Sequence, residues 1–421
     1  MDDIDIPDED ISLAVAQKLG IPNAVDLIDC TLMPFTEKIG LLGDHAFLEA
    51  TVLDESTGSK TTARFFVKYF PKTENQARFA EQIGAFKKEE FAYEIFSKFA
   101  DHGVSVITKC TPTCHLAKSN RYLFLDDLEE QGFTPVSKHQ YLDYDSVLVI
   151  LHSLSQLHAS SIIFEERKSQ QLRTEYRLNR EYPDGFDESF FDDVVNKRGV
   201  DASIKCVLRE IDMFEFPEEL FPAGNFSRAA AKVLQKIFDL VKPSPRHRNV
   251  LCHGDLWSNN FLVKFNHDRP EKCKFVDFQS ARYVPPAHDV LSVIYLTTSR
   301  RFRDANMYQM IGMYYSYLEK HVKAGGFDLA SVVPFVEFME SCEEQKVFAI
   351  LQAAIYFPLI LMRNDCLEKY FADPDLYEEV FFNDRSQLVV DYVDQDEMYR
   401  ERLKESIQDL KECCETVAHI R

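Results

Sequence analysis

Alternating hydrophobic and polar positions predict a β-hairpin in the first quarter of the chain. From Thr36 onward, the segment LLGDHAFLEATVLDE, the turn STGSK and the segment TTARFFVKYF have the pattern of two antiparallel strands. Helical spacing occurs before them in residues 11–19, behind an acidic start, and after Pro71 in FAEQIGAFKKEEFAYEIFSKFA. Lys68 lies in the last predicted strand, and Glu89 lies in the following helix, from which it can point back toward the sheet.

The rest of the chain has mostly helical periodicity. Residues 105–128 contain two strand-like pieces that end in RYLFLDDLEEQGF, where an apolar strand meets acidic residues and Gly132, a pattern typical of a hinge. Helices are predicted in SVLVILHSLSQLHASSI and AAAKVLQKIFDLV, with a polar, less predictable region at 168–222 between them. Strands return in NVLCHGDLWSNNFLVKF and KCKFVDFQSARYV, which a polar turn at 266–271 separates.

These elements predict an α+β fold with two parts. A length of 421 residues favours two lobes or domains, since one domain usually has ~100 to 200 residues. We expect the first part to span residues 1–128, with a small antiparallel sheet and a helix. The second, larger and mostly helical part is expected to span 129–421, with the hinge near 124–130.

Composition favours a globular protein and argues against several partners. Apolar residues make up 45% of the chain, and 34 Phe with 18 Tyr supply large side chains for a core. The formal net charge of -21 argues against nucleic acids and anionic membranes, because both are bound through Lys and Arg. The longest apolar stretch, residues 348–362, is too short to cross a bilayer of ~30 Å, so we expect a buried helix and no membrane insertion.

Cysteine usage and the first residues favour a cytoplasmic protein. The ten cysteines have no metal-ligand spacing, since Cys110 and Cys114 lack a second close pair and Cys413 and Cys414 are simply adjacent. We therefore expect reduced thiols. The start MDDIDIPDED has no basic region followed by an apolar run, so it resembles neither a signal peptide nor a transit peptide. Nothing in the sequence indicates an oligomeric state.

The strongest chemical signal is a pair of short motifs, HGDLWSNN at 253–260 and VDFQ at 276–279. Phosphoryl transfer needs a carboxylate that receives or orients the acceptor hydroxyl, and oxygen ligands that hold Mg²⁺ against the phosphates of ATP. Asp255 supplies that carboxylate, and Asn260 and Asp277 supply the metal ligands. The spacing therefore predicts phosphoryl transfer that uses ATP and Mg²⁺ as cofactors.

At these residues the sequence resembles the aminoglycoside-phosphotransferase and choline-kinase superfamily, and its motifs are most similar to the ecdysteroid kinase-like branch of insects, with Trp257 as the branch-like detail. The resemblance extends more weakly through the strand of Lys68, the FKKEEFAY helix, the FLDDL hinge, SLSQLHA and PPAHDVLSVIYL. It implies a bilobal protein-kinase-like fold and a kinase that phosphorylates a small molecule. Asp255 would be the catalytic aspartate, Asn260 and Asp277 the metal ligands, and Asp289 the brace of the catalytic loop.

The resemblance also assigns residues to nucleotide binding. Lys68 would contact the α- and β-phosphates, and Glu89 would pair with Lys68. Backbone groups for adenine would come from Asp126, Asp127 and Leu128. The segment GLLGD, with Gly40 and Gly43, is expected near the phosphates, although it differs from the G-x-G-x-x-G loop of protein kinases.

Departures from the protein-kinase motifs favour a small-molecule alcohol over a protein substrate. Gln279 replaces the glycine of D-F-G, and Gly254 stands where protein kinases have the arginine of H-R-D. Only eleven residues separate Asp277 from Asp289, which leaves little room for a segment that positions a peptide.

A bulky apolar alcohol, such as an ecdysteroid-like steroid or a xenobiotic, is the expected acceptor. The resemblance implies such a molecule, and the helical second half is rich in candidate pocket walls: Tyr295, Met307, Met310, Met313, Tyr314, Tyr315, Phe348, Tyr356 and Phe357. Side chains of these types more often form an ordinary core. A choline or ethanolamine type of kinase is the second hypothesis. It ranks below the bulky alcohol because the chain has only one Trp, the side chain that best binds a quaternary ammonium.

Two other classes of function remain open. The chain could be a catalytically silent kinase-fold protein that binds a ligand without turnover. It could also be a metal-dependent hydrolase with His253, Asp255, Asp277 and His288 as ligands, which would leave Lys68 and Glu89 without a role. Taken alone, His253 and His158 are each more typical of structural than of catalytic histidines.

Overall fold

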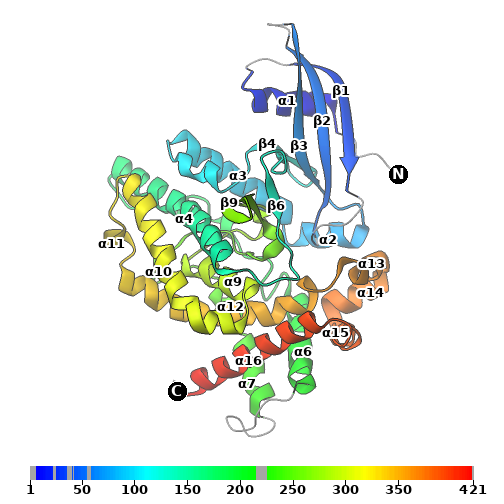
Figure 1. Cartoon of the computed structure of the whole chain (residues 1–421), viewed down its shortest axis with the longest axis vertical. Helices are drawn as coiled ribbons and strands as arrows, with labels where there is room; N and C mark the ends of the chain where they lie inside the picture. The colour runs from blue at the N-terminus through cyan, green and yellow to red at the C-terminus, as the bar shows by residue number, and fades with distance from the viewer. Residues whose placement is uncertain are drawn as a thin grey trace.

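The computed structural model describes residues 6–21, 25–35, 40, 42–54, 58–214 and 225–419. A small antiparallel sheet lies at one end of the molecule, and a larger, mostly helical part lies at the other (Figure 1). The expected α+β class is therefore confirmed. Parts of several predicted segments lie outside the described residues, namely residues 1–5, 36–39, 41, 55–57 and 215–224.

The N-terminal sheet is built around the predicted hairpin. Its strand order is β1-β2-β3-β5-β4, and all neighbours are antiparallel. The strands are β1 (Asp26–Pro34), β2 (Asp44–Asp54), β3 (Ser59–Tyr69), β4 (Cys114–Lys118) and β5 (Tyr122–Asp126). Helix α1 (Asp8–Leu19) covers one face of this sheet, where Ile11 and Val15 share a core cluster with Leu48 and Phe65. The apolar alternation of β2 and β3 thus buries one side of the hairpin.

Two of our expectations about this part are wrong. We expected strands only from Thr36, but β1 already pairs with β2 from Asp26. As an edge strand, β1 leaves many of its side chains exposed, so its sequence lacks a clear apolar alternation. We also expected one helix after Pro71, but α2 (Glu74–Gln82) and α3 (Ala85–Asp101) are separate helices, because Gly84 has a left-handed φ of 64°.

Two further small sheets surround the motifs. The chain leaves β5 at Asp126, turns through Gly132 and enters β6, so the stretch for which we predicted a hinge lies between two sheets. One sheet has the order β6-β8-β9 and the other pairs β10 with β7. Their strands are β6 (Phe133–Pro135), β7 (Val250–Cys252), β8 (Phe261–Asn266), β9 (Arg269–Phe275) and β10 (Arg282–Val284). The short turns η3 (Ser258–Asn260) and η4 (Phe278–Ser280) carry the ends of the two motifs.

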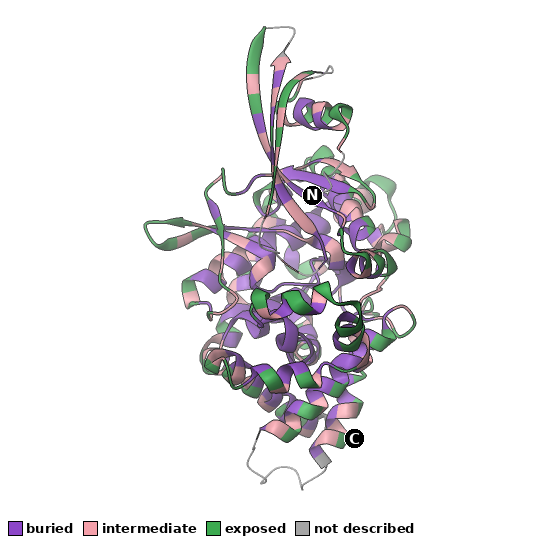
Figure 2. Cartoon of the chain, turned by 90° about the vertical axis from the view of Figure 1, so that its right-hand side faces the viewer, coloured by how far each residue is buried: buried purple, intermediate pink, exposed green. Residues whose placement is uncertain are grey.

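Helices make up most of the second part. They are α4 (Tyr144–Leu172), α5 (Leu178–Glu181), α6 (Lys197–Met213), α7 (Asn225–Leu234), α8 (Ile237–Leu240), α9 (Ala287–Thr297), α10 (Arg300–Ala324), α11 (Leu329–Val332), α12 (Phe335–Ile360), α13 (Asn364–Ala372), α14 (Pro374–Glu378), α15 (Ser386–Tyr392) and α16 (Glu397–His419). The single-turn or short segments are η1 (Ser105–Lys109), η2 (Asp184–Phe186) and η5 (Glu379–Asn383). The predicted helix at 229–241 is divided into α7 and α8. Figure 2 shows the buried residues concentrated where these helices pack together.

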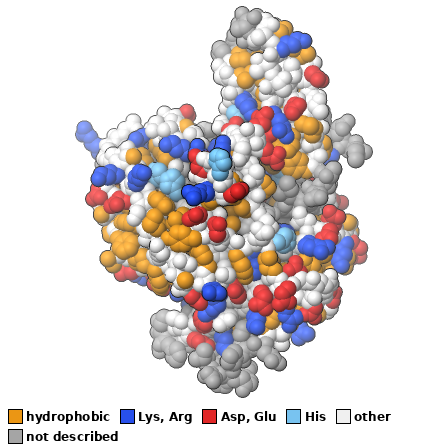
Figure 3. Space-filling view, viewed as in Figure 1, with side chains coloured by type: hydrophobic (Ala, Val, Ile, Leu, Met, Phe, Trp, Pro, Cys, Tyr) orange, Lys and Arg blue, Asp and Glu red, His pale blue; other side chains and the backbone are white. Residues whose placement is uncertain are grey.

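The apolar helices lie inside the fold. Residues 348–360, in the stretch we expected to be a buried helix, form the end of α12 and are all buried. By length and hydropathy one described helix, α4, could cross a membrane, and α12 with α13 passes only as a pair bent by 79°. Of the apolar window in α4, 83% is buried by other elements, which is the behaviour of a core helix. On the face shown in Figure 3, acidic side chains lie among the basic ones.

Candidate active site

Lys68 joins the N-terminal sheet to both acidic partners that the motifs supply. Its Nζ lies 2.6 Å from Glu89 Oε2 on α3 and 2.6 Å from Asp277 Oδ1, which directly precedes η4. Burial alone would lower the pKa of Lys68, but the carboxylates of Asp277 and Glu89 outweigh burial and raise this pKa above its usual value. Asp277 has a left-handed φ of 66°, a conformation that residues with a side chain adopt rarely.

Asp255 and Asn260 form the second half of the cluster. Asn260 Nδ2 donates to the backbone oxygen of Asp255 at 2.7 Å and to its Oδ2 at 2.9 Å. The other carboxylate oxygen, Oδ1, is buried and has no hydrogen-bond partner among the described residues. Burial, followed by the charge of Asp277, raises the pKa of Asp255 to about 7. A carboxyl group with this pKa can exchange a proton near neutral pH.

Backbone hydrogen bonds fix the loop that carries Asp255. The backbone N–H groups of His253 and Gly254 donate to the two oxygens of Asp289, at 2.6 and 2.9 Å, as expected for a brace. His253 is engaged at both ring nitrogens, with Val276 O at 2.9 Å and the N–H of Asp255 at 3.3 Å. It is therefore a structural residue of the loop.

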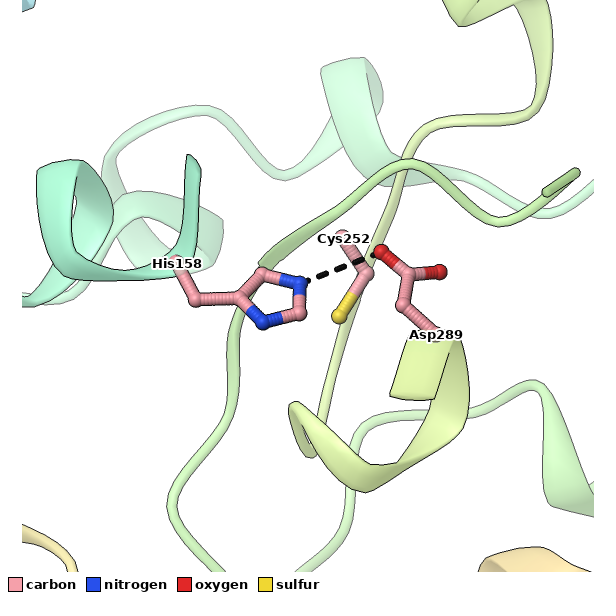
Figure 4. A group of neighbouring side chains, drawn as sticks. All are labelled: His158, Cys252 and Asp289. Carbon is pink, nitrogen blue, oxygen red and sulfur yellow. Dashed lines mark hydrogen bonds and ion pairs between the residues drawn. The ribbon is translucent and has the colours of Figure 1, made fainter. Parts of the chain in front are cut away.

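One group of metal-ligand types occurs among the described residues, and it is structural too. The ligand atoms of His158, Cys252 and Asp289 lie within 4.8 Å of one another (Figure 4). Each is already used: His158 contacts Asp289 and Tyr314, Asp289 accepts from the loop, and the thiol of Cys252 donates to the carbonyl of Val284. Burial raises the pKa of that thiol well above its usual value, so it is a poor metal ligand.

Arg282 packs closely against Gly254, which has no side chain to exclude it. Gly254 has a φ of 82°, and a Cβ there would lie 2.1 Å from Ser280 O and 2.7 Å from Arg282 Nη1. Arg282 donates to Gly254 O at 2.5 Å and pairs with Glu188 Oε2 at 2.5 Å. The backbone N–H groups of Phe190 and Phe191 also donate to Glu188 Oε1, at 2.9 and 2.8 Å. We had predicted no role for Arg282 or Glu188.

A pocket opens between the two parts beside Lys68, and we call it the nucleotide pocket after the residues that the resemblance assigns to nucleotide binding. It contains about 890 Å³ of empty space, its open mouth included. Its lining includes Phe35, His45, Phe47, Phe66, Lys68, Glu89, Asp126, Asp127, Leu128, Asn260 and Asp277. The aromatic side chains of β2 and β3 can cover a planar base, while Lys68 faces the acidic cluster. Of the predicted nucleotide residues, all but Gly43 line this one pocket.

The hinge side chains that line this pocket already have partners in the protein. Asp126 accepts from the N–H of Thr113 at 3.0 Å and contacts His115 Nε2 at 2.9 Å. Asp127 pairs with Arg64 at 3.1 Å. The carbonyl of Leu128 accepts from the N–H of Phe133, so it is already used in the turn. Any contact of this stretch with adenine has to come from its remaining backbone groups.

The two glycines of the GLLGD segment have different surroundings. Gly40 lines the nucleotide pocket, has a φ of 77° and has open space around it. At Gly43 a Cβ would lie 3.0 Å from Lys68 Cε, so this backbone packs directly on the lysine. Gly43 therefore supports Lys68, and Leu41 between them lies outside the described residues.

A second, apolar pocket adjoins the first. It contains about 990 Å³ of empty space, its open mouth included. Asp255, Asp277 and Trp257 line it together with apolar side chains from α2, α6, α12, η5 and the segments beside α2 and α6. These side chains are Phe79 of α2, Ile83 just after α2, Phe190 and Phe191 before α6, Val200 of α6, Ile355, Tyr356, Leu359 and Ile360 of α12, and Phe381 of η5. Of the nine wall residues suggested by the sequence, only Tyr356 lines this pocket. The other residues that line the pocket come largely from regions 168–222 and 377–385, where the sequence shows no motif.

The metal-dependent hydrolase hypothesis is wrong for these residues. His288 contacts Gln345 Oε1 at 3.0 Å and stacks on Phe348 with ring centroids 3.9 Å apart. With both nitrogens of His253 also engaged, the proposed four ligands form no common site among the described residues.

The donor set at the junction of the two pockets fits a magnesium ion. Asn260 uses its Nδ2 for Asp255, which leaves its Oδ1 available, and Asp277 adds a carboxylate. Carboxylate and amide oxygens are the ligand types that Mg²⁺ prefers. The partner-free Oδ1 of Asp255 lies in the same cluster.

One protein-family model matches the sequence of this chain. A model described as the ecdysteroid kinase-like family matches residues 47–327, a span that contains Lys68, Glu89, Asp255, Asn260 and Asp277. A comparison of the sequence with curated proteins gave no match.

Several solved structures are similar to this chain. One is an ethanolamine kinase of Plasmodium vivax, 12% identical, covering 90% of this chain and 81% of that chain with a TM-score of 0.39. A microcompartment-associated aminopropanol kinase is 13% identical, covering 85% of this chain and 97% of that chain with a TM-score of 0.31. An aminoglycoside phosphotransferase from Streptomyces rimosus, in complex with ADP and streptomycin, is 13% identical, covering 82% of this chain and 98% of that chain with a TM-score of 0.31.

Proposed function

The chain belongs to the ecdysteroid kinase-like family, and from its site we propose that it is an ATP- and Mg²⁺-dependent kinase of small alcohols. It transfers the γ-phosphate to a hydroxyl of a bulky apolar alcohol, such as an ecdysteroid-like steroid or a xenobiotic. One observation carries this proposal: Asp277 lines both the nucleotide pocket and the apolar pocket, and Asp255 lines the apolar one. The junction of the two pockets is where a nucleotide phosphate and an alcohol can meet.

Each residue of the cluster has a definite task in this reaction. Asp255 takes the proton of the acceptor hydroxyl as the hydroxyl oxygen bonds to the γ-phosphorus, while the bond from that phosphorus to the bridging oxygen of ADP breaks. Lys68, held by Glu89, neutralises phosphate charge. Asn260 and Asp277 would hold Mg²⁺, which supplies further charge neutralisation when bound.

The lining of the second pocket supports an apolar acceptor. Its walls are mainly aromatic and branched aliphatic side chains, which favour a large hydrophobic molecule. The silent-protein hypothesis gains no support, because Lys68, Asp255 and Asp277 are all present and close together.

Transfer of labelled γ-phosphate tests this function. Purified protein with Mg-ATP is incubated with a panel of steroid alcohols, aliphatic alcohols, choline and ethanolamine, and products are identified by mass spectrometry. We expect phosphorylated steroid or similarly bulky alcohols from the wild type and none from Asp277→Ala, with full activity in the exposed control Asp375→Asn. Transfer that persists in Asp277→Ala, or transfer to choline alone, would contradict the proposal.

A further inference from the structure

Three polar side chains surround Gly199 in the otherwise apolar pocket. Arg385, just before α15, points its Nη2 toward Gly199 O at 3.5 Å, and Ser203 Oγ donates to the same carbonyl at 2.8 Å. A Cβ built on Gly199 would meet Asn196 Oδ1 at 2.5 Å. All three side chains are buried, and all three line the pocket that also contains Asp255.

Arg385 is poorly satisfied by the protein. It is only 5% exposed, its Nε has no hydrogen-bond partner, and Nη2 makes two long contacts of 3.5 Å to the carbonyls of Gly199 and Phe381. No carboxylate among the described residues lies within ion-pair distance of it. Burying a guanidinium with so few partners destabilises the fold, because the charge loses its hydration and gains few hydrogen bonds in return.

The acidic side chain behind Arg385 does not compensate its charge at neutral pH. Glu210 is fully buried, and burial raises its pKa to about 8, so the carboxyl is mostly protonated at pH 7. Its Oε2 also has no partner. Asn196 Oδ1 is a third buried atom without a partner, although Asn196 Nδ2 donates to Phe190 O at 3.0 Å.

This polar group and Asp255 belong to separate hydrogen-bond networks on the pocket wall. Arg385 and Ser203 contact the carbonyl of Gly199, and Asn196 donates to the carbonyl of Phe190. Asp255 contacts Asn260. No hydrogen bond joins the two networks among the described residues.

We propose that Arg385 and Asn196 bind a carbonyl or hydroxyl oxygen of the acceptor that is remote from the hydroxyl to be phosphorylated. This inference rests on the proposed function and narrows its substrate class to apolar alcohols with a second oxygen function. Arg385 donates to that oxygen, and Asn196 Oδ1 accepts from it where it is a hydroxyl. The bound oxygen gives Arg385 a hydrogen-bond partner that the protein itself does not supply.

Unfolding of the ligand-free protein provides the first test. Arg385→Met keeps the length of the side chain but removes an unpaired buried charge, so we expect it to unfold at a higher temperature than the wild type. The control is Arg402→Met, because Arg402 is equally buried but donates to Lys138 O at 2.9 Å and Leu296 O at 2.5 Å, and its loss should lower Tm. A lower Tm for Arg385→Met as well would overturn the proposal, since Arg385 would then be a structural residue.

Binding measured by calorimetry, without ATP, provides the second test. The probes are epiandrosterone, a rigid steroid alcohol with a ketone opposite its hydroxyl, and its analogue without the ketone. We expect the wild type to bind epiandrosterone about 10-fold or more tightly than the analogue, and Arg385→Met to bind both alike. A preference for epiandrosterone that survives in Arg385→Met, or the absence of this preference in the wild type, would contradict the proposed binding of the second oxygen by Arg385. Failure of both steroids to bind would contradict the steroid class of the proposed function, and the unfolding comparison would still decide the role of Arg385.

Discussion

Gly43 matters because of the lysine that lies against it. The Nζ of Lys68 is fixed between Glu89 and Asp277, so Lys68 Cε cannot swing away freely from a side chain at residue 43. Gly43 has an ordinary φ, and its importance therefore lies in close approach rather than in backbone strain.

Substitution of Gly43 by valine should weaken nucleotide binding. A Cβ 3.0 Å from Lys68 Cε forces the lysine to shift, and the added methyl groups increase that shift. Because a charged hydrogen bond contributes about 1.5 to 3 kcal/mol, we expect the affinity for Mg-ATP to fall roughly tenfold or more. Titration calorimetry measures this directly. The matched control is Gly312→Val on α10, where nothing lies within 4 Å, and an equal loss of affinity there would contradict the explanation.

The sequence predicted the reactive residues that lie at fixed spacings within short motifs. Asp255, Asn260 and Asp277 could be predicted because one loop and one strand carry them all, and their chemistry admits few other residue types. Arg282 and Arg385 could not be predicted. A single arginine outside a motif is normally exposed, and only long-range packing places these two inside the protein.

At the scale of elements, an ion pair connects the wall of the apolar pocket to the catalytic loop. Glu188, between η2 and α6, holds the chain at Phe190 and Phe191 and pairs with Arg282 on β10. Arg282 in turn donates to Gly254 O in the loop of Asp255. The acceptor wall and the catalytic loop are thus fixed to the same buried guanidinium.

This ion pair should make stability depend on acid pH. Burial would raise the pKa of Glu188, but Arg282 and then Lys88 outweigh it and lower this pKa to about 2. A lowered carboxyl pKa stabilises the fold above the unfolded-state value of about 4.5, and the stabilisation is lost as pH falls from there toward 2. Its size is on the order of 3 kcal/mol.

Glu188→Gln should therefore be less stable than the wild type at pH 7 and should lose part of the decline in stability below about pH 4.5. Urea unfolding at a series of pH values measures both effects. The exposed Glu401 on α16 is a matched control, since Glu401→Gln should leave the curve unchanged. Coincident curves for wild type and Glu188→Gln would show that the ion pair contributes no net stability, and parallel curves would contradict the predicted pH dependence.

Elements with strong periodicity were predictable from the sequence, and their interruptions were not. The hairpin of β2 and β3 and the core helix α4 follow from their apolar patterns. The edge strand β1 was missed because half-exposed strands carry little pattern. The break at Gly84 was missed because a glycine is also tolerated inside a helix, at a cost of about 1 kcal/mol.

At the scale of the whole molecule, the site is formed where the sheet, the motif loops and the helical part meet. The nucleotide pocket combines β2, β3 and α3 with the two motifs, and the apolar pocket adds α2, α6, α12 and η5. These helices are separated by up to several hundred residues in the sequence. Their convergence on Asp255 is a property of packing, which is why the sequence indicated the reaction but gave only Tyr356 of the acceptor wall.

The central claim is that Asp255 acts on the acceptor and contributes little to holding the nucleotide, because it lines only the apolar pocket of the two. The most direct measurement compares wild type with Asp255→Asn in single-turnover phosphate transfer to the best alcohol acceptor, alongside calorimetric binding of Mg-ATP. We predict that transfer falls by ~10²- to 10⁴-fold while the affinity for Mg-ATP changes by less than about threefold. Undiminished transfer, or a loss of transfer explained by an equal loss of nucleotide binding, would contradict the account.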